Sequence, residues 1–184
     1  MSDVVRAGAA VIVAAVVGIV AAGCGGPHAE GAQPSGHVHH GHAERSADFG
    51  KVYTIHGGAG PWVVAGWRMG QHAMKVLGTS PYDFDLEVTH VSPKQVQYSC
   101  IADGAAAATG ASLGKLNLRL DEAPRDRLAT TYRKKSTGQA ITLRPTTAFE
   151  ARFKDVPREK LGDAGAEVRG LSDSEIFEVV PERP

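Results

Sequence analysis

The chain has 184 residues, of which 42% are hydrophobic, and this is enough for one ordinary domain with extensions. Its 20 basic side chains balance its 20 acidic ones, and this zero net charge argues against a nucleic-acid-binding protein, which needs a basic face. Two cysteines are too few for a disulfide-rich scaffold or for a zinc site made of cysteines alone.

The N-terminus carries an uncharged apolar segment, residues 7–22, built from Ala, Val, Ile and Gly. It is shorter than the roughly 20 residues of a membrane-spanning helix and is typical of a signal peptide. It runs into Val20-Ala21-Ala22-Gly23-Cys24, which resembles a bacterial lipobox. We therefore expect residues 1–23 to be a lipoprotein signal peptide. Lipidated Cys24 would anchor the protein to the membrane, on the periplasmic or extracytoplasmic face of the cell envelope. An ordinary secreted protein is the alternative.

Residues 24–49 are expected to be the lipidated cysteine and a flexible linker, because they are rich in Gly, Ala, Pro and Ser and show no hydrophobic periodicity. Neutral imidazole is a good ligand for zinc, copper and nickel, and four histidines lie close together in this linker. We expect them to contact metal ions, and a soluble spacer with incidental histidines is the alternative. These histidines are His37, His39, His40 and His42.

The folded domain is expected over residues 50–180 and begins with a helix over 61–77. Pro61 suits the first helical turn, where its missing N–H costs nothing, and Gly78 ends the helix. Apolar residues recur on one helix face at steps of three and four, from Val63 to Leu77. The segment 84–90 alternates between apolar and polar residues, which predicts a half-buried strand with His90 on its inward face.

The remaining elements indicate an α+β domain. We expect helices packed on a mixed, largely antiparallel sheet, without regular alternation of parallel strands and helices. The further elements predicted are a helix over 100–108, a strand over 116–120, a hairpin of strands 128–135 and 139–144, helices over 146–153 and 157–169, and a last strand over 176–180.

Two motifs carry a family resemblance. The first is His56-Gly57-Gly58-Ala59-Gly60-Pro61 followed by Gly66-Trp67-Arg68-Met69-Gly70, and the second is Cys100-Ile101-Ala102-Asp103 leading to Thr109-Gly110-Ala111-Ser112-Leu113-Gly114-Lys115-Leu116-Asn117-Leu118. Together they resemble the FmdE family of formylmethanofuran dehydrogenase components. The resemblance implies a compact α+β fold like that of FwdE and GAPDH domains, and often a homodimer. It also implies a metal site, typically for zinc, at the family's His and Cys positions.

The sequence departs from the family at three of these positions. Gly60 and Ala111 stand where the family has Cys, and Gly58 stands where it has His. Of the metal positions only His56 and Cys100 remain, fewer than the three or four protein ligands that zinc needs.

Two further side chains are candidates to complete the site. His90 faces inward from its strand, and Asp103 lies one helical turn from Cys100 on the same face. The predicted set for zinc or copper is therefore His56, His90, Cys100 and Asp103. In the alternative, His90 is a core histidine, Cys100 a small buried hydrophobe and Asp103 a cap, and the site has been abandoned or repurposed.

Lys115 and Asn117 match family positions and are expected to line the same cleft, with an exposed strand face as the alternative. The loop from Gly57 to Gly60 precedes a helix but lacks the Lys-Ser/Thr pair of a phosphate-binding loop. We therefore expect no nucleotide.

These patterns favour a metal-binding lipoprotein of the bacterial envelope that handles or senses zinc, with copper or nickel as alternatives. The expected partners are the membrane through Cys24, a metal ion and a second copy of the chain. The alternative is an accessory component or a small enzyme of a redox or one-carbon pathway, which would use Cys100 as a nucleophile or a metal-activated water. The sequence shows no Ser-His-Asp order and no paired carboxylates, so a non-enzymatic role is favoured.

Overall fold

The computed structural model describes residues 48–181. The predicted signal peptide over 1–23, the lipidation site Cys24 and the four linker histidines lie outside the described residues. Within the described part of the chain, none of the helices has both the length and the apolar character needed to cross a membrane.

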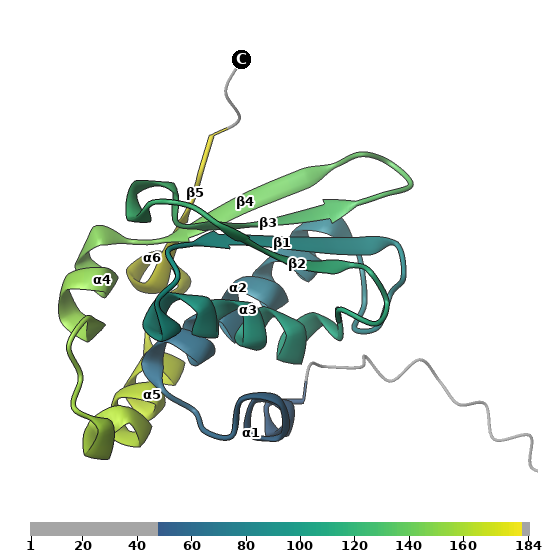
Figure 1. Ribbon diagram of the computed structural model, residues 1–184. Coiled ribbons are helices and arrows are strands. Elements are labelled where there is room, and N and C mark those ends of the chain that lie inside the picture. Colours follow the sequence, from purple (N-terminus) through teal and green to yellow (C-terminus); the bar gives the residue numbers. More distant parts are fainter. Residues whose placement is uncertain (1–47, 182–184) are drawn as a thin grey trace, which may run out of the picture. The chain divides into compact units, whose positions relative to one another are not determined.

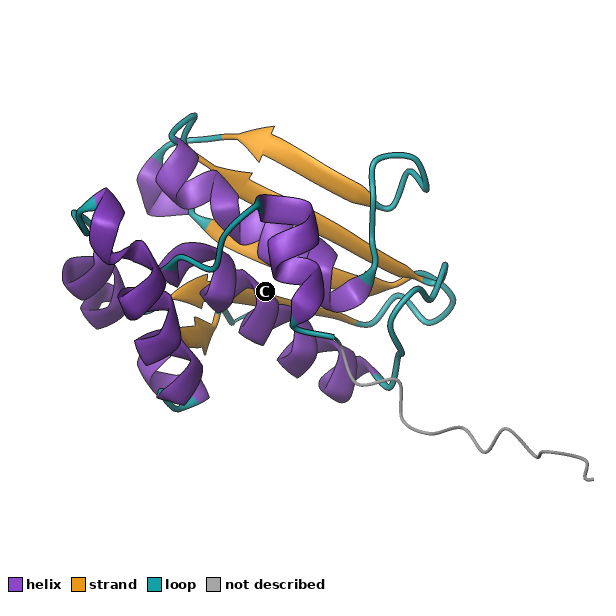
Figure 2. Ribbon diagram, turned by 90° about the horizontal axis from the view of Figure 1, so that it is seen from below, coloured by secondary structure: helices purple, strands orange, loops and turns teal. Residues whose placement is uncertain are grey.

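The described residues form a five-stranded sheet with helices on one face, which confirms the predicted α+β class (Figures 1 and 2). The strand order is β2-β1-β3-β4-β5, and every neighbouring pair is antiparallel except β1 and β2. The helix that connects this parallel pair is α3, and this one parallel crossover makes the sheet mixed, as predicted. The strands are β1 (Leu86–Ser92), β2 (Leu118–Glu122), β3 (Ala129–Lys134), β4 (Ala140–Pro145) and β5 (Phe177–Val179).

The helices match the predicted ones with two additions. The predicted helix over 61–77 is confirmed, since α2 spans Pro61–Leu77, with Pro61 in its first turn and Gly78 ending it in a left-handed conformation (φ 60°). The helices α1 and α6 were not predicted, and α3 begins four residues before its predicted start. The helices are α1 (Gly50–His56), α2 (Pro61–Leu77), α3 (Val96–Thr109), α4 (Thr147–Phe153), α5 (Leu161–Gly170) and α6 (Asp173–Ile176), with 3-10 turns at Arg125–Arg127 and Arg158–Lys160.

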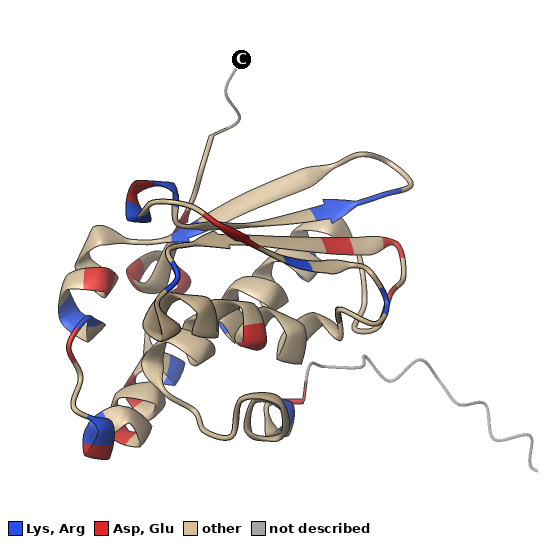
Figure 3. Ribbon diagram, in the orientation of Figure 1, with Lys and Arg blue, Asp and Glu red and all other residues tan. Residues whose placement is uncertain are grey.

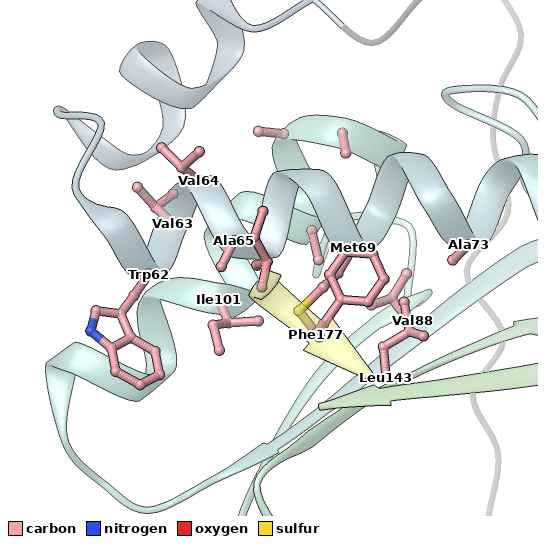
Figure 4. Close-up of a cluster of buried hydrophobic side chains, with 14 of the residues drawn as sticks. Trp62, Val63, Val64, Ala65, Met69, Ala73, Val88, Ile101, Leu143 and Phe177 are labelled. Atoms are coloured by element: carbon pink, nitrogen blue, oxygen red, sulfur yellow. The ribbon is translucent and has the colours of Figure 1, made fainter. Parts of the chain in front are cut away.

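The core lies between α2 and the sheet. Figure 4 shows Met69 of α2 among Val88 of β1, Leu143 of β4 and Phe177 of β5, and all four are buried. Basic and acidic positions are interspersed along the ribbon (Figure 3), which fits the zero net charge of the chain.

Two glycines let α2 and α3 pack backbone against backbone. A Cβ atom added to Gly66 would collide with the carbonyl oxygen of Ile101, and one added to Gly104 would collide with the carbonyl oxygen of Val63. Protein interiors are packed too closely to absorb such overlaps without movement. This close approach fixes Cys100 of α3 beside the start of α2.

Candidate functional site

A cavity of about 700 Å³ opens between three segments of the domain. One wall is the loop 57–60, which joins α1 to α2, and a second is the first half of α3. The third is the segment 153–162, which runs from the end of α4 into α5. Gly57 ends α1 and turns the chain sharply into this loop, because it adopts the left-handed conformation (φ 80°) that glycine reaches easily.

His56, the last residue of α1, lines this cavity and is held by Asp103 of α3. Its Nδ1 lies 2.8 Å from the Asp103 carboxylate, and the two side chains are 24% and 47% exposed. An ionised carboxylate can only accept, so Nδ1 donates the hydrogen bond and Nε2 of the neutral ring keeps a free lone pair. This is the carboxylate–histidine arrangement that orients imidazoles toward metal ions.

Cys100 lines the same cavity and is half-buried. Burial, and then the negative charge of Asp103, raise the pKa of its thiol to about 11. The thiol is therefore protonated at neutral pH and is a poor nucleophile. A bound cation would reverse this balance by stabilising the thiolate.

His90 is a core histidine and lies outside the cavity. Its side chain is fully buried, its Nδ1 accepts a hydrogen bond from Thr130 Oγ1 at 2.8 Å, and its Nε2 donates to the Tyr98 carbonyl oxygen at 3.1 Å. Both ring nitrogens are thus occupied, and burial lowers the pKa of His90 to about 4. The structure does not bring His90 to His56. The described residues hold no cluster of three or more His, Cys, Asp or Glu side chains arranged around one ion.

Lys115 and Asn117 are not among the residues that line the cavity. Asn117 is buried, accepts a hydrogen bond from the Ser112 amide at 3.0 Å and donates to the Leu86 carbonyl oxygen at 2.9 Å. The Lys115 ammonium donates to the Gly110 carbonyl oxygen at 2.7 Å. Both side chains hold the loop between α3 and β2.

The three positions that depart from the family pattern divide into two groups. Gly58 and Gly60 line the cavity, and a Cβ atom at Gly58 would have no atom within 4 Å. A Cβ atom at Gly60 would meet only the Leu161 side chain, at 3.8 Å. Both positions therefore open into the cavity, whereas Ala111 is packed in the core and does not line it.

The sequence did not predict the apolar side chains that line the cavity, which we call its apolar wall: Trp62, Phe153, Val156 and Leu161. Trp62 of α2 donates a hydrogen bond from Nε1 to the Phe153 carbonyl oxygen at 2.9 Å, across 91 positions of sequence. Val156 and Leu161 extend this wall, and Gln97, Lys154 and Arg158 add polar groups. No local motif marks these residues, because only tertiary packing brings them together.

The FmdE family model, described as "Molybdenum formylmethanofuran dehydrogenase operon", matches residues 55–178. No curated protein matches the chain. The matched range covers more than half of the 184 residues and contains His56, Cys100 and Asp103. It relates the domain to accessory proteins associated with formylmethanofuran dehydrogenase. The chain belongs to the FmdE family.

Proposed function

We propose that this protein is a metal-binding accessory protein of the bacterial cell envelope, anchored to the membrane through lipidated Cys24. His56 and Cys100 are its metal ligands within the domain, and Asp103 is the residue that orients His56. The observation that carries the proposal is the 2.8 Å hydrogen bond from His56 to Asp103, at the edge of the cavity that Cys100 also lines.

The donor set fits an open metal site and does not fit a closed one. A structural zinc site takes four protein ligands and a catalytic site takes three, whereas this cavity offers one imidazole and one thiol. That pair suits zinc or the softer monovalent copper ion. The remaining coordination positions would be filled by water or by a ligand from outside the chain. An ion held by two residues of the domain exchanges readily, which suits a protein that passes metal on.

The ionisation of Cys100 makes such binding depend on pH. A thiol must lose its proton to bind a metal ion, so binding releases a proton. Because the pKa of Cys100 is about 11, the apparent affinity should rise about tenfold per pH unit between pH 7.5 and 9.

An accessory role is favoured over an enzyme with a cysteine nucleophile. Such an enzyme needs an activated thiolate with a base in hydrogen-bond reach. The raised pKa of Cys100 gives the opposite protonation state, and the hydrogen bonds of the described residues join His56 to Asp103 but not to Cys100.

The test is a titration of the full chain with Zn²⁺ and, under reducing conditions, with Cu⁺. His28, the four clustered linker histidines and Cys24 are replaced by Ala in every protein. About one equivalent of one of these ions should bind, and His56→Ala or Cys100→Ala should abolish this binding. Asp103→Asn should weaken it by roughly 10- to 100-fold, the usual effect of removing a partner that orients a ligand.

The matched control is His72→Ala. His72 has a similar exposure of 29% and is also hydrogen-bonded to an aspartate, Asp173, at 3.1 Å, but it lies outside the cavity. Its replacement should leave binding unchanged. The proposal is wrong if the linker-substituted chain binds neither ion, or if His72→Ala weakens binding as much as His56→Ala.

A further inference from the structure

The cavity is larger and more apolar than a metal ion requires. Its volume of about 700 Å³ falls in the range of roughly 300–1,000 Å³ that is typical of small-molecule sites. Part of its floor is bare backbone, because Gly58 and Gly60 place no side chain there. The space is thus accessible to an organic molecule.

The apolar wall is held in place by its own contacts. Trp62 packs edge-on against Tyr98 and Phe149, with ring centroids 5.0 and 5.2 Å apart, and its Nε1 hydrogen bond fixes it to Phe153. Trp62 and Phe153 are only 4% and 3% exposed. A wall whose side chains are already ordered loses little conformational entropy when a ligand binds.

The formally charged side chains that line the cavity are both basic. Lys154 and Arg158 line it, and none of the described residues that line it is acidic. The ion pairs of the described residues include neither of these two cations, although their neighbours Arg152 and Lys160 are paired with Glu167 and Asp163. Asp155 and Glu159 belong to the same segment but do not line the cavity.

Two further groups offer hydrogen-bond donors at the cavity. Gln97 also lines the cavity, and its amide nitrogen Nε2 is buried without a hydrogen-bond partner in the described part of the chain. Buried donors normally have an acceptor, so we expect this nitrogen to donate a hydrogen bond to a bound ligand. The first turn of α2 has neither a side-chain cap at Gly60 nor an acidic residue, and this leaves the positive end of the helix uncompensated.

We propose that the cavity binds a small apolar monocarboxylate. The hydrocarbon part of the ligand packs on Trp62 and Phe153, and its carboxylate lies near Lys154, Arg158 and Gln97. This binding does not require a metal ion at His56 and Cys100, so it stands apart from the proposed metal binding and can be tested separately.

The test is calorimetric titration of the full chain in excess EDTA with 3-phenylpropionate, using the neutral 3-phenylpropan-1-ol as the matched probe. The acid should bind at one site, about tenfold or more tightly than the alcohol, because only the acid pairs with the cations. Replacing Lys154 and Arg158 by Ala should remove this preference and leave the weak binding of the alcohol unchanged. The control pair Lys75→Ala and Arg133→Ala, two exposed cations outside the cavity, should have no effect.

A second pair of variants tests the location. Gly58→Leu should fill the cavity and abolish binding of the acid, whereas Gly114→Leu, at an equally open glycine outside the cavity, should not. Circular dichroism should show both variants folded. Equal affinity for acid and alcohol, or equal losses in the test and control variants, would overturn the proposal. So would binding of the acid only when Zn²⁺ replaces EDTA, because the carboxylate would then be a metal ligand.

Discussion

The glycine contact between α2 and α3 makes a sharp prediction for Gly104→Ala. A Cβ atom at position 104 would lie within 3.0 Å of three backbone atoms of α2, which belong to Val63, Gly66 and Trp67. Backbone atoms cannot rotate away as side chains do, so the two helices must move apart. Overpacking of this kind costs about 1–3 kcal/mol and sometimes more, while the change from Gly to Ala inside a helix returns about 1 kcal/mol. Because the added Cβ would overlap directly with the Val63 carbonyl oxygen, we expect a cost near the upper end, about 3 kcal/mol. The net loss in the free energy of unfolding is then about 2 kcal/mol.

The assay is urea unfolding at pH 7 together with thermal melting. For a domain of this size, a loss of about 2 kcal/mol lowers Tm by roughly 6–10 °C. The control is Gly162→Ala, at a glycine of α5 whose added Cβ would meet no atom within 4 Å, and it should change stability by less than about 1 kcal/mol. Because Cys100 and Asp103 lie on α3, Gly104→Ala should also weaken metal binding. A Gly104→Ala protein as stable as the parent would refute the argument from backbone contact.

Three further predictions concern titratable groups that are wholly or partly buried. Burial lowers the pKa of His90 from 6.5 to about 4, so the stability conferred by its neutral form is fully present above pH 6.5 and is lost as the pH falls toward 4. In urea titrations, the free energy of unfolding should fall by about 1.4 kcal/mol for each pH unit in this window, and His90→Gln should remove that dependence. An unchanged dependence in His90→Gln would show that His90 is not the titrating group. The raised pKa of Cys100 should make its alkylation by iodoacetamide at pH 8 about 100-fold slower than that of a free thiol, and Asp103→Asn should speed this reaction. An alkylation rate like that of glutathione would contradict the raised pKa. The buried hydroxyl of Tyr132 has no hydrogen-bond partner in the described part of the chain, so Tyr132→Phe should be neutral or about 1 kcal/mol stabilising, and a clear loss of stability would reveal a partner.

Elements with strong local signals could be predicted from the sequence. Pro61 and Gly78 bracket α2, and the turn of the hairpin β3–β4 contains Gly138 with a positive φ of 74°. The start of α3 was missed because Val96, in its first turn, is 79% exposed and adds no apolar periodicity. The helix α1 was missed for a similar reason, since Val52 is the one buried residue among its seven.

The candidate site could be predicted only in part. Alternation along β1 indicated that His90 is buried, but it could not show that the facing residues are Thr130 and the Tyr98 backbone rather than His56. The contact between His56 and Asp103 joins residues 47 positions apart, and it depends on the packing of α1 against α3. Such distant contacts follow from tertiary packing, which a local pattern does not encode.

The hydrogen bond from Trp62 to Phe153 links the beginning of the domain to its C-terminal third. The whole sheet except β5 lies between these residues in sequence, so the cavity has all three walls only after most of the chain has folded. A ligand that needs the assembled cavity therefore binds the native state and not the unfolded chain, so it raises Tm further as its concentration increases above Kd. A thermal-shift screen of metal ions and organic acids would use this linkage to rank ligands without an activity assay. Because the segment 153–162 forms one wall, a chain truncated before α4 would lack the cavity even if strands β1 to β4 formed their sheet.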